Sequence, residues 1–188
     1  MTMKPALIAL GVAALAACSS TTTRLSAPVP PSTLNLTARM STVVLRDVTL
    51  PAYAASEEIA LETAPGVITS DGDLLSADDP GRGVTLALAR QMDDILSAVV
   101  GPEPWPFPSI PDVVVDVRVT DMLGSAVTGT YRLSGQYFIG GDGIDYPNSA
   151  QAFDYVIPMS APDQSGAVAA QGVALTRLAE DIARRLGR

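Results

Sequence analysis

Between residues 112 and 159 the chain alternates apolar and polar residues, and this pattern constrains the fold more than any other feature. The alternation occurs in three successive segments, residues 113–119, 131–139 and 153–159, which are separated by glycine-containing turns. A period of two places the apolar side chains on one face of a strand and the polar ones on the other. Because the connections are short, we predict neighbouring antiparallel strands with one face covered and the other in solvent.

Two other stretches repeat apolar residues at helical spacing. The first stripe, in residues 82–100, consists of Val84, Leu88, Met92, Ile95 and Val99, and the second, in residues 165–186, of Leu175, Leu178, Ile182 and Leu186. Such stripes are typical of helices with one face in the core. We expect Asp78 or Asp79 to cap the first helix, Gly101 and Pro102 to end it, and Gly187 to end the second.

The remaining segments complete the predicted architecture. Residues 41–50 are rich in β-branched side chains and residues 57–62 alternate, so both are predicted strands. Residues 65–79 are predicted to be a loop with short strands at 67–69 and 74–75. Residues 103–111 contain four prolines and are predicted to be irregular. The predicted fold class is α+β, a two-layer sandwich of an antiparallel or mixed sheet with two amphipathic helices on one face.

The N-terminus has the pattern of a bacterial secretory signal. Lys4 precedes a short apolar run that ends in Leu15-Ala16-Ala17-Cys18. This run is shorter than the roughly 20 residues that a membrane-spanning helix needs. The ending resembles the lipobox of bacterial lipoproteins, in which the cysteine becomes the mature N-terminus and is acylated, for example with palmitate. The alternative is an ordinary signal peptide. Cys18 is the only cysteine, and Ser19 after it favours the outer membrane.

These observations divide the chain into three parts. Residues 1–17 are the predicted signal peptide. Residues 18–38 are the predicted lipidated N-terminus and a Pro/Ser/Thr-rich tether, part of which could lie along the domain as an edge strand because Leu34 and Leu36 alternate. Residues 39–188 are predicted to form a single domain. Several acyl chains on Cys18 would make the membrane anchor effectively stable.

The residue types that are missing exclude most enzyme and cofactor chemistry. The chain has no histidine, and its only lysine, Lys4, lies in the signal. Catalytic triads and dyads that need histidine, lysine or a free thiol are therefore impossible, and the usual ligands of zinc, haem and iron–sulfur clusters are missing. We predict a protein that is not an enzyme and carries no cofactor. The 20 acidic residues against 12 basic ones argue against binding nucleic acid.

Three local motifs are candidates for a metal-binding, phosphate-binding or docking site. The acidic residues at 71, 73, 78 and 79 offer carboxylates for calcium, but Leu75 stands where an EF-hand loop needs an oxygen ligand, which favours a solvated loop. The glycine-rich residues 140–143 form a turn without the lysine of a phosphate-binding loop. Trp105 and Phe107, which lie among prolines, are candidates for an exposed docking patch or for a plug at one end of the core.

The chain resembles the ABC-type transport auxiliary lipoproteins, the family that includes the lipoprotein of the paraquat-inducible transport system. The resemblance covers roughly residues 40–187 together with the lipobox. It rests on the order of the elements and on three segments, namely Val48-Thr49-Leu50-Pro51-Ala52-Tyr53, the helix–strand block of residues 86–119, and Leu178-Ala179-Glu180-Asp181-Ile182-Ala183.

The resemblance implies a non-enzymatic, lipid-anchored periplasmic component of an ABC system that moves lipid or another hydrophobic substrate. Its partner would be a substrate-binding protein with a mammalian-cell-entry domain, which the lipoprotein would help to dock at the outer membrane. Two alternatives stay open, a stand-alone outer-membrane lipoprotein that scaffolds envelope assembly and a small lipid or ligand binder. A homo-oligomer is also open.

Overall fold

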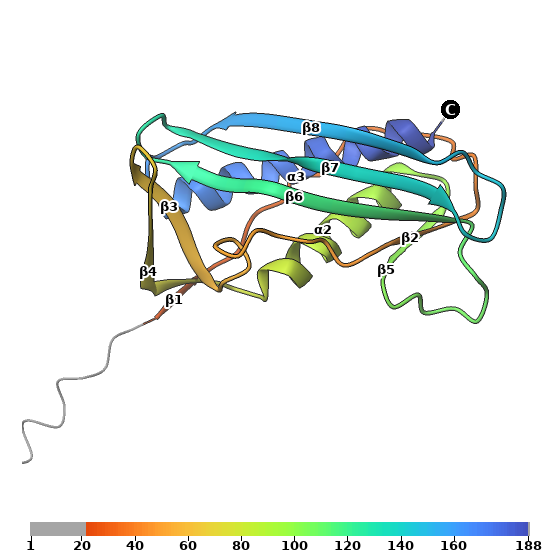
Figure 1. Cartoon of the computed structure of the whole chain (residues 1–188), viewed down its shortest axis with the longest axis horizontal. Coiled ribbons are helices and arrows are strands. Elements are labelled where there is room, and N and C mark those ends of the chain that lie inside the picture. Colours follow the sequence, from red (N-terminus) through yellow and green to blue (C-terminus); the bar gives the residue numbers. More distant parts are fainter. Residues whose placement is uncertain (1–21, 188) are drawn as a thin grey trace, which may run out of the picture.

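A two-layer arrangement of helices on a sheet forms the body of the molecule. The computed structural model describes residues 22–187, so Cys18 and the predicted signal peptide lie outside it. Within residues 22–187, eight strands form one curled mixed sheet, and helices α2 (Pro80–Ile95) and α3 (Gln164–Leu186) pack against one face of it (Figure 1). The predicted α+β class, with two helices on one face, is confirmed.

The three alternating segments form the predicted antiparallel meander. These strands are β6 (Val113–Ser125), β7 (Thr130–Gly141) and β8 (Ser149–Pro158), with β7 paired to both neighbours. In β6 the side chains of Val113, Val115 and Val117 are buried, whereas Arg118 and Thr120 are exposed. The alternation therefore fixes which face of the meander meets the helices.

Shorter strands extend the sheet from the other edge of β6. Strand β2 (Thr42–Leu45) pairs in parallel with the start of β6, and β3 (Glu58–Ala64) pairs in parallel with its end. Strand β5 (Val99–Pro102) joins β2, β4 (Val67–Ser76) joins β3, and β1 (Thr23–Leu25) joins β4. The predicted strand over residues 41–50 is thus shorter than expected, and Thr49 makes only a single bridge to Arg118.

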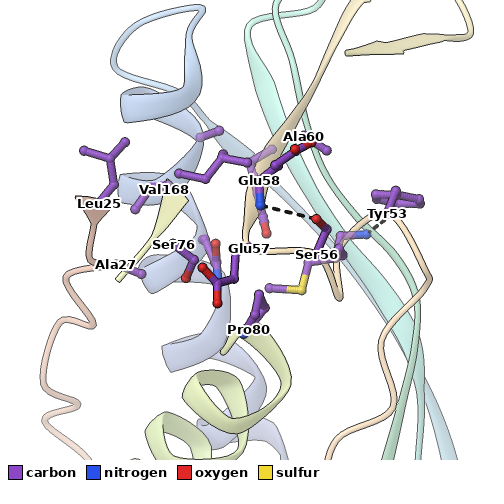
Figure 2. Close-up of a pocket in the computed structure, with 16 residues that line it drawn as sticks. Leu25, Ala27, Tyr53, Ser56, Glu57, Glu58, Ala60, Ser76, Pro80 and Val168 are labelled. Carbon is purple, nitrogen blue, oxygen red and sulfur yellow. Dashed lines mark hydrogen bonds between the residues drawn. The ribbon is translucent and has the colours of Figure 1, made fainter. Parts of the chain in front are cut away.

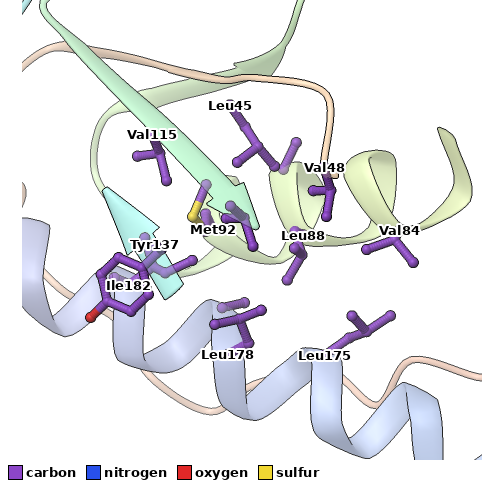
Figure 3. Packing of buried hydrophobic residues seen from close by; sticks show 14 of the residues in the cluster. Leu45, Val48, Val84, Leu88, Met92, Val115, Tyr137, Leu175, Leu178 and Ile182 are labelled. Atoms are coloured by element: carbon purple, nitrogen blue, oxygen red, sulfur yellow. The ribbon is translucent and has the colours of Figure 1, made fainter. Parts of the chain in front are cut away.

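The core lies between the meander and the two helices. Leu88 and Met92 of α2 and Leu178 and Ile182 of α3 are fully buried and face Val115 and its neighbours on the sheet (Figure 3). These helical residues belong to the stripes recognised in the sequence. Burying a side chain of this size contributes about 1.5–3 kcal/mol, so the two stripes account for much of the driving force for folding.

Residues 65–79 are more regular than predicted, because the short strands expected at 67–69 and 74–75 belong to one continuous strand. Strand β4 runs unbroken from Val67 to Ser76 and forms a hairpin with β3, in which Gly66 at the turn has a φ of 73°. The loop part of the prediction was wrong because most of this strand is exposed, so no buried face imposes an alternating pattern. Its acidic side chains are typical of loops, but the pairing with β3 and β1 makes the segment a strand.

The first helix ends earlier than its apolar stripe predicts. Helix α2 stops at Ile95, Leu96 adopts an extended conformation, and Val99 begins β5. Leu36 donates its N–H to the carbonyl of Ile95 at 2.8 Å, so a neighbouring segment takes over the hydrogen bonding at the helix end. Pairing of all four β5 residues with β2 then favours a strand over another helical turn. The N-cap prediction is confirmed for Asp79, whose carboxylate accepts the N–H of Arg82.

Most of the predicted tether is packed against the domain. Residues 26–38, which we call the strap, follow β1 and cross the helices. The carbonyl of Pro30 accepts hydrogen bonds from Gln91 of α2 and Thr176 of α3 at 2.9 and 2.8 Å. Ser32 donates to Glu180 at 2.7 Å. A Cβ atom on Gly172 would lie 1.9 Å from the Pro28 carbonyl oxygen, so glycine is required for this close approach. A composition typical of a linker was thus misleading.

Candidate docking site

The proline-rich segment of residues 103–111 leaves the body of the molecule between β5 and β6 as an irregular loop. Both of its ends are fixed to β2. The N–H of Glu103 donates to the carbonyl of Leu45 at 2.8 Å, and the carboxylate of Asp112 accepts the N–H groups of Ser41 and Thr42 at 2.8 and 3.0 Å. The prolines restrict the backbone between these two points. The loop is therefore pre-organised, which lowers the entropy that a binding partner would have to overcome.

Trp105 is half-buried and supports the loop from inside. Its six-membered ring packs on β5, where a Cβ atom on Gly101 would lie 3.2 Å from the ring. The indole Nε1 is buried and has no hydrogen-bond partner among the residues that the structure describes. A buried donor without a partner costs about 1–3 kcal/mol, so packing must compensate for this loss. Trp105 therefore packs against the body of the domain, and docking through this segment stays a prediction.

The exposed apolar surface consists mainly of two other residues of the loop. Phe107 packs edge-on against Trp105 with ring centroids 5.0 Å apart, yet 51% of it remains exposed. Ile110 is 66% exposed. We call Trp105, Phe107 and Ile110 the aromatic patch. Ile110 was not among the predicted site residues, although its place among prolines in a segment that cannot form a strand was a usable signal. Exposed apolar side chains on a stiff loop are typical of binding surfaces.

The aromatic patch lies far from the point where the described chain begins. The loop between β5 and β6 is at one end of the long axis of the molecule, and β1 is at the other end (Figure 1). The aromatic patch and β1, the strand that follows the predicted anchor in the sequence, are therefore at opposite ends of the domain. Nothing in the sequence pattern could have revealed this separation.

The structure does not bring the acidic residues of the 71–79 segment together. Asp71 accepts the N–H of Asp73 within β4, Asp78 pairs with Arg82, and Asp79 caps α2. Within residues 22–187 no group of three or more potential metal ligands is found. The carboxylates of Asp71, Asp78 and Asp79 thus each have a local structural partner.

Two surface pockets are candidate ligand sites. One lies among β1, β3, β6 and α3, holds about 80 Å³, and is lined by Leu25, Tyr53 and Val168 among others (Figure 2). It is smaller than the roughly 300–1,000 Å³ of typical small-molecule pockets. The other, of about 600 Å³, is an open depression on the uncovered face of the sheet. The aromatic patch is therefore the better candidate site.

Comparison with known proteins places the sequence in a family. Residues 24–183 match the family described as ABC-type transport auxiliary lipoprotein component. The chain belongs to this family. The match begins within β1, so this strand and the strap that follows it lie within the matched region. No curated protein matches the sequence.

Two solved structures share the fold of this auxiliary lipoprotein. One is an uncharacterised protein, with a TM-score of 0.66 and 17% identity over 89% of this chain and 99% of the other. The second is protein XCC0632 from Xanthomonas campestris, of the DUF330 family, with a TM-score of 0.62 and 14% identity over 86% of this chain and 90% of the other. At these identities the likeness establishes the fold.

On the uncovered face of the sheet, the charges of the auxiliary lipoprotein are paired with one another. Arg118 donates two 3.1 Å hydrogen bonds to Asp116 and lies 5.0 Å above the ring of Phe138. The bond from Arg118 holds the pKa of Asp116 below its usual value, against a smaller opposing effect of burial. Arg46 lies 3.6 Å from the same carboxylate. The two arginines share one acidic partner, so the group of Arg46, Asp116 and Arg118 carries one net positive charge.

No helix within residues 22–187 of the auxiliary lipoprotein is long and apolar enough to cross a membrane.

Proposed function

We propose that this auxiliary lipoprotein is anchored through Cys18 in the outer membrane, faces the periplasm and docks a mammalian-cell-entry-type component of an ABC system that moves lipid or another hydrophobic substrate. The family assignment over residues 24–183 carries the transport role. The Leu15-Ala16-Ala17-Cys18 sequence supports the anchor, and Ser19 supports the outer membrane. The protein acts by binding a partner and catalyses no reaction.

The aromatic patch supports the docking part of this proposal. Phe107 and Ile110 are exposed on a loop whose ends are fixed to β2, and Trp105 holds Phe107 in place. Aromatic side chains that protrude from a rigid backbone are frequent hot spots of protein interfaces. By contrast, the 80 Å³ pocket does not favour the alternative of a ligand binder.

The anchor is tested by replacing Cys18 with serine. The variant is expected to accumulate as an unlipidated precursor that does not fractionate with the outer membrane. Normal processing of Cys18→Ser, with unchanged recovery in outer-membrane fractions, would contradict the anchor.

The transport role is tested by co-purification. The tagged, lipidated chain, extracted in mild detergent from cells that express the whole transport system, is expected to recover its mammalian-cell-entry component. The Cys18→Ser chain, expressed without its signal and added to the same extract, should bind the component as well, because the patch is distant from the anchor. Failure of the wild-type chain to recover any transport component would contradict the proposal.

A further inference from the structure

The position of the strap determines how much chain separates the domain from its anchor. Thr23 is the first residue of β1 and pairs with Leu74 of β4. Four residues, 19–22, therefore separate Cys18 from Thr23, so the connection spans five Cα–Cα steps. A fully extended chain spans at most about 3.6 Å per residue, so this connection reaches no more than about 18 Å. The tether predicted from the sequence, residues 18–38, would have reached about 75 Å by the same rule.

The contacts of the strap keep this connection short. Residues 28–38 are held at successive points by Gln91, Thr176, Glu180 and the carbonyl of Ile95. These partners lie on both helices, and the backbone of Pro28 packs directly on Gly172 of α3, too closely for a Cβ atom at that position. Release of the strap would break these bonds together, so it does not act as extra tether length.

We infer that the domain is held by its β1 end directly at the surface of the anchoring membrane, with the aromatic patch at the end that points away from that membrane. This inference rests on the anchor in the proposed function. Strand β1 and the loop between β5 and β6 lie at opposite ends of the long axis (Figure 1). In the inferred orientation the aromatic patch is therefore farther from the lipid surface than β1 is. The aromatic patch is then a docking surface for a protein that approaches from across the periplasm, and not a second membrane contact.

Two exposed positions are suited to probes that report how far each end of the domain lies from the membrane. Asp73 lies beside the entry of the chain, because β1 and β4 run in parallel and Thr23 pairs with the next residue, Leu74. Ser109 lies in the exposed loop between Phe107 and Ile110. Cys18 is the only cysteine of the chain, and acylation blocks its thiol. Asp73→Cys and Ser109→Cys therefore each give a single site for a fluorescent donor.

The experiment measures energy transfer from each donor to acceptor-labelled lipids. The full lipidated chain is reconstituted in vesicles of phosphatidylethanolamine and phosphatidylglycerol, after mass spectrometry has shown the lipid on Cys18. We expect strong transfer from Asp73→Cys and clearly weaker transfer from Ser109→Cys. Insertion of 20 Gly/Ser residues after Ser20 adds a flexible chain of about 25 Å root-mean-square length and should lower the transfer from Asp73→Cys.

Equal transfer from the two positions would overturn the inference, because the domain would then lie flat or move freely. Stronger transfer from Ser109→Cys would also overturn it and would assign the aromatic patch to the membrane. Transfer from Asp73→Cys that the 20-residue insertion leaves unchanged would contradict the short connection. If mass spectrometry finds no lipid on Cys18, the proposed anchor is contradicted. The proposed localisation and this inference then both fail.

Discussion

The hydroxyl group of Tyr53 donates a 2.7 Å hydrogen bond to the carboxylate of Asp121 on β6. The same oxygen accepts the backbone N–H of Met122 at 3.0 Å. Tyr53 ends the Leu50-Pro51-Ala52-Tyr53 turn, one of the segments that carry the family resemblance. Its side chain thus fixes the connection between β2 and β3 to β6, beyond the single bridge from Thr49 to Arg118 and before the pairing with β3.

Replacement of Tyr53 by phenylalanine should destabilise the domain. The change removes two hydrogen bonds and leaves the N–H of the buried Met122 without its acceptor. We expect a loss of about 1–2 kcal/mol in the free energy of unfolding, seen as a lowered midpoint in urea denaturation. Tyr146→Phe is the control, because its hydroxyl makes only one long bond of 3.4 Å to the carbonyl of Arg185. Equal stability of the two variants would contradict this role of Tyr53.

Tyr53 also predicts how stability depends on alkaline pH. Burial raises its pKa to about 12, with the hydrogen bond to Asp121 adding to the increase. An unfolded chain loses the phenolic proton near pH 10, whereas the folded protein keeps it until about pH 12. The contribution is therefore complete below pH 10 and is lost as the pH rises from 10 to 12.

Urea denaturation at several pH values between 9 and 12 measures this effect. The fall in stability should be less steep in Tyr53→Phe than in the wild type. It should not disappear, because burial also raises the pKa of Tyr131 and Tyr155. Identical slopes for the two proteins would show that Tyr53 titrates normally in the folded state.

Two helical glycines should respond in opposite ways to alanine. Gly172→Ala places a methyl group against the Pro28 carbonyl, so the strap must shift, and overpacking of this kind costs about 1–3 kcal/mol. Gly83→Ala, in α2, meets nothing closer than 3.9 Å and should stabilise the protein by about 0.5–1 kcal/mol. Thermal unfolding of both variants tests the packing of the strap. If Gly172→Ala left the melting temperature unchanged, the strap would not be held where the structure places it.

Trp105 should tolerate phenylalanine better than alanine. Alanine removes the ring that covers Gly101, with an expected loss of about 2 kcal/mol for a half-buried aromatic side chain. Phenylalanine keeps much of this packing and removes the buried Nε1–H that has no partner among the described residues. The melting temperature of Trp105→Phe should therefore stay close to that of the wild type. A loss as large as that of Trp105→Ala would indicate that Nε1 is hydrogen-bonded in solution.

Much of the fold could be predicted because buried faces impose periodic patterns. The alternating valines of β6 and the leucine stripe of α3 each indicated which side chains are buried in the core. Strand β4 shows no such pattern because it is mostly exposed. The apolar stripe of α2 extended into β5 because Val99 falls at helical spacing, although its side chain is exposed. The alternation of Leu34 and Leu36 suggested that part of the tether lies along the domain, and Leu36 does bridge Leu96. The path of the strap across the helices could not be predicted, since its partners on α2 and α3 are up to 148 positions away in the sequence.

The candidate site was predicted less completely than the fold. Proline spacing marked the loop as irregular, and it pointed to Trp105 and Phe107. The exposure of each side chain depends on tertiary contacts, however, so the sequence could not distinguish the supporting Trp105 from the exposed Phe107 and Ile110. The position of the patch relative to the anchor depends on the parallel pairing of β1 with β4, between residues about 50 positions apart.

The affinity of the lipidated chain for its mammalian-cell-entry component, compared between the wild type and a Phe107→Ala/Ile110→Ala variant, tests the central claim most directly. Both side chains are exposed, so the melting temperature of the variant should match the wild type. If the patch is the docking surface, loss of these two contacts should weaken binding by about 2 kcal/mol or more, roughly a 30-fold increase in Kd. Unchanged affinity in a folded variant would contradict docking through the aromatic patch.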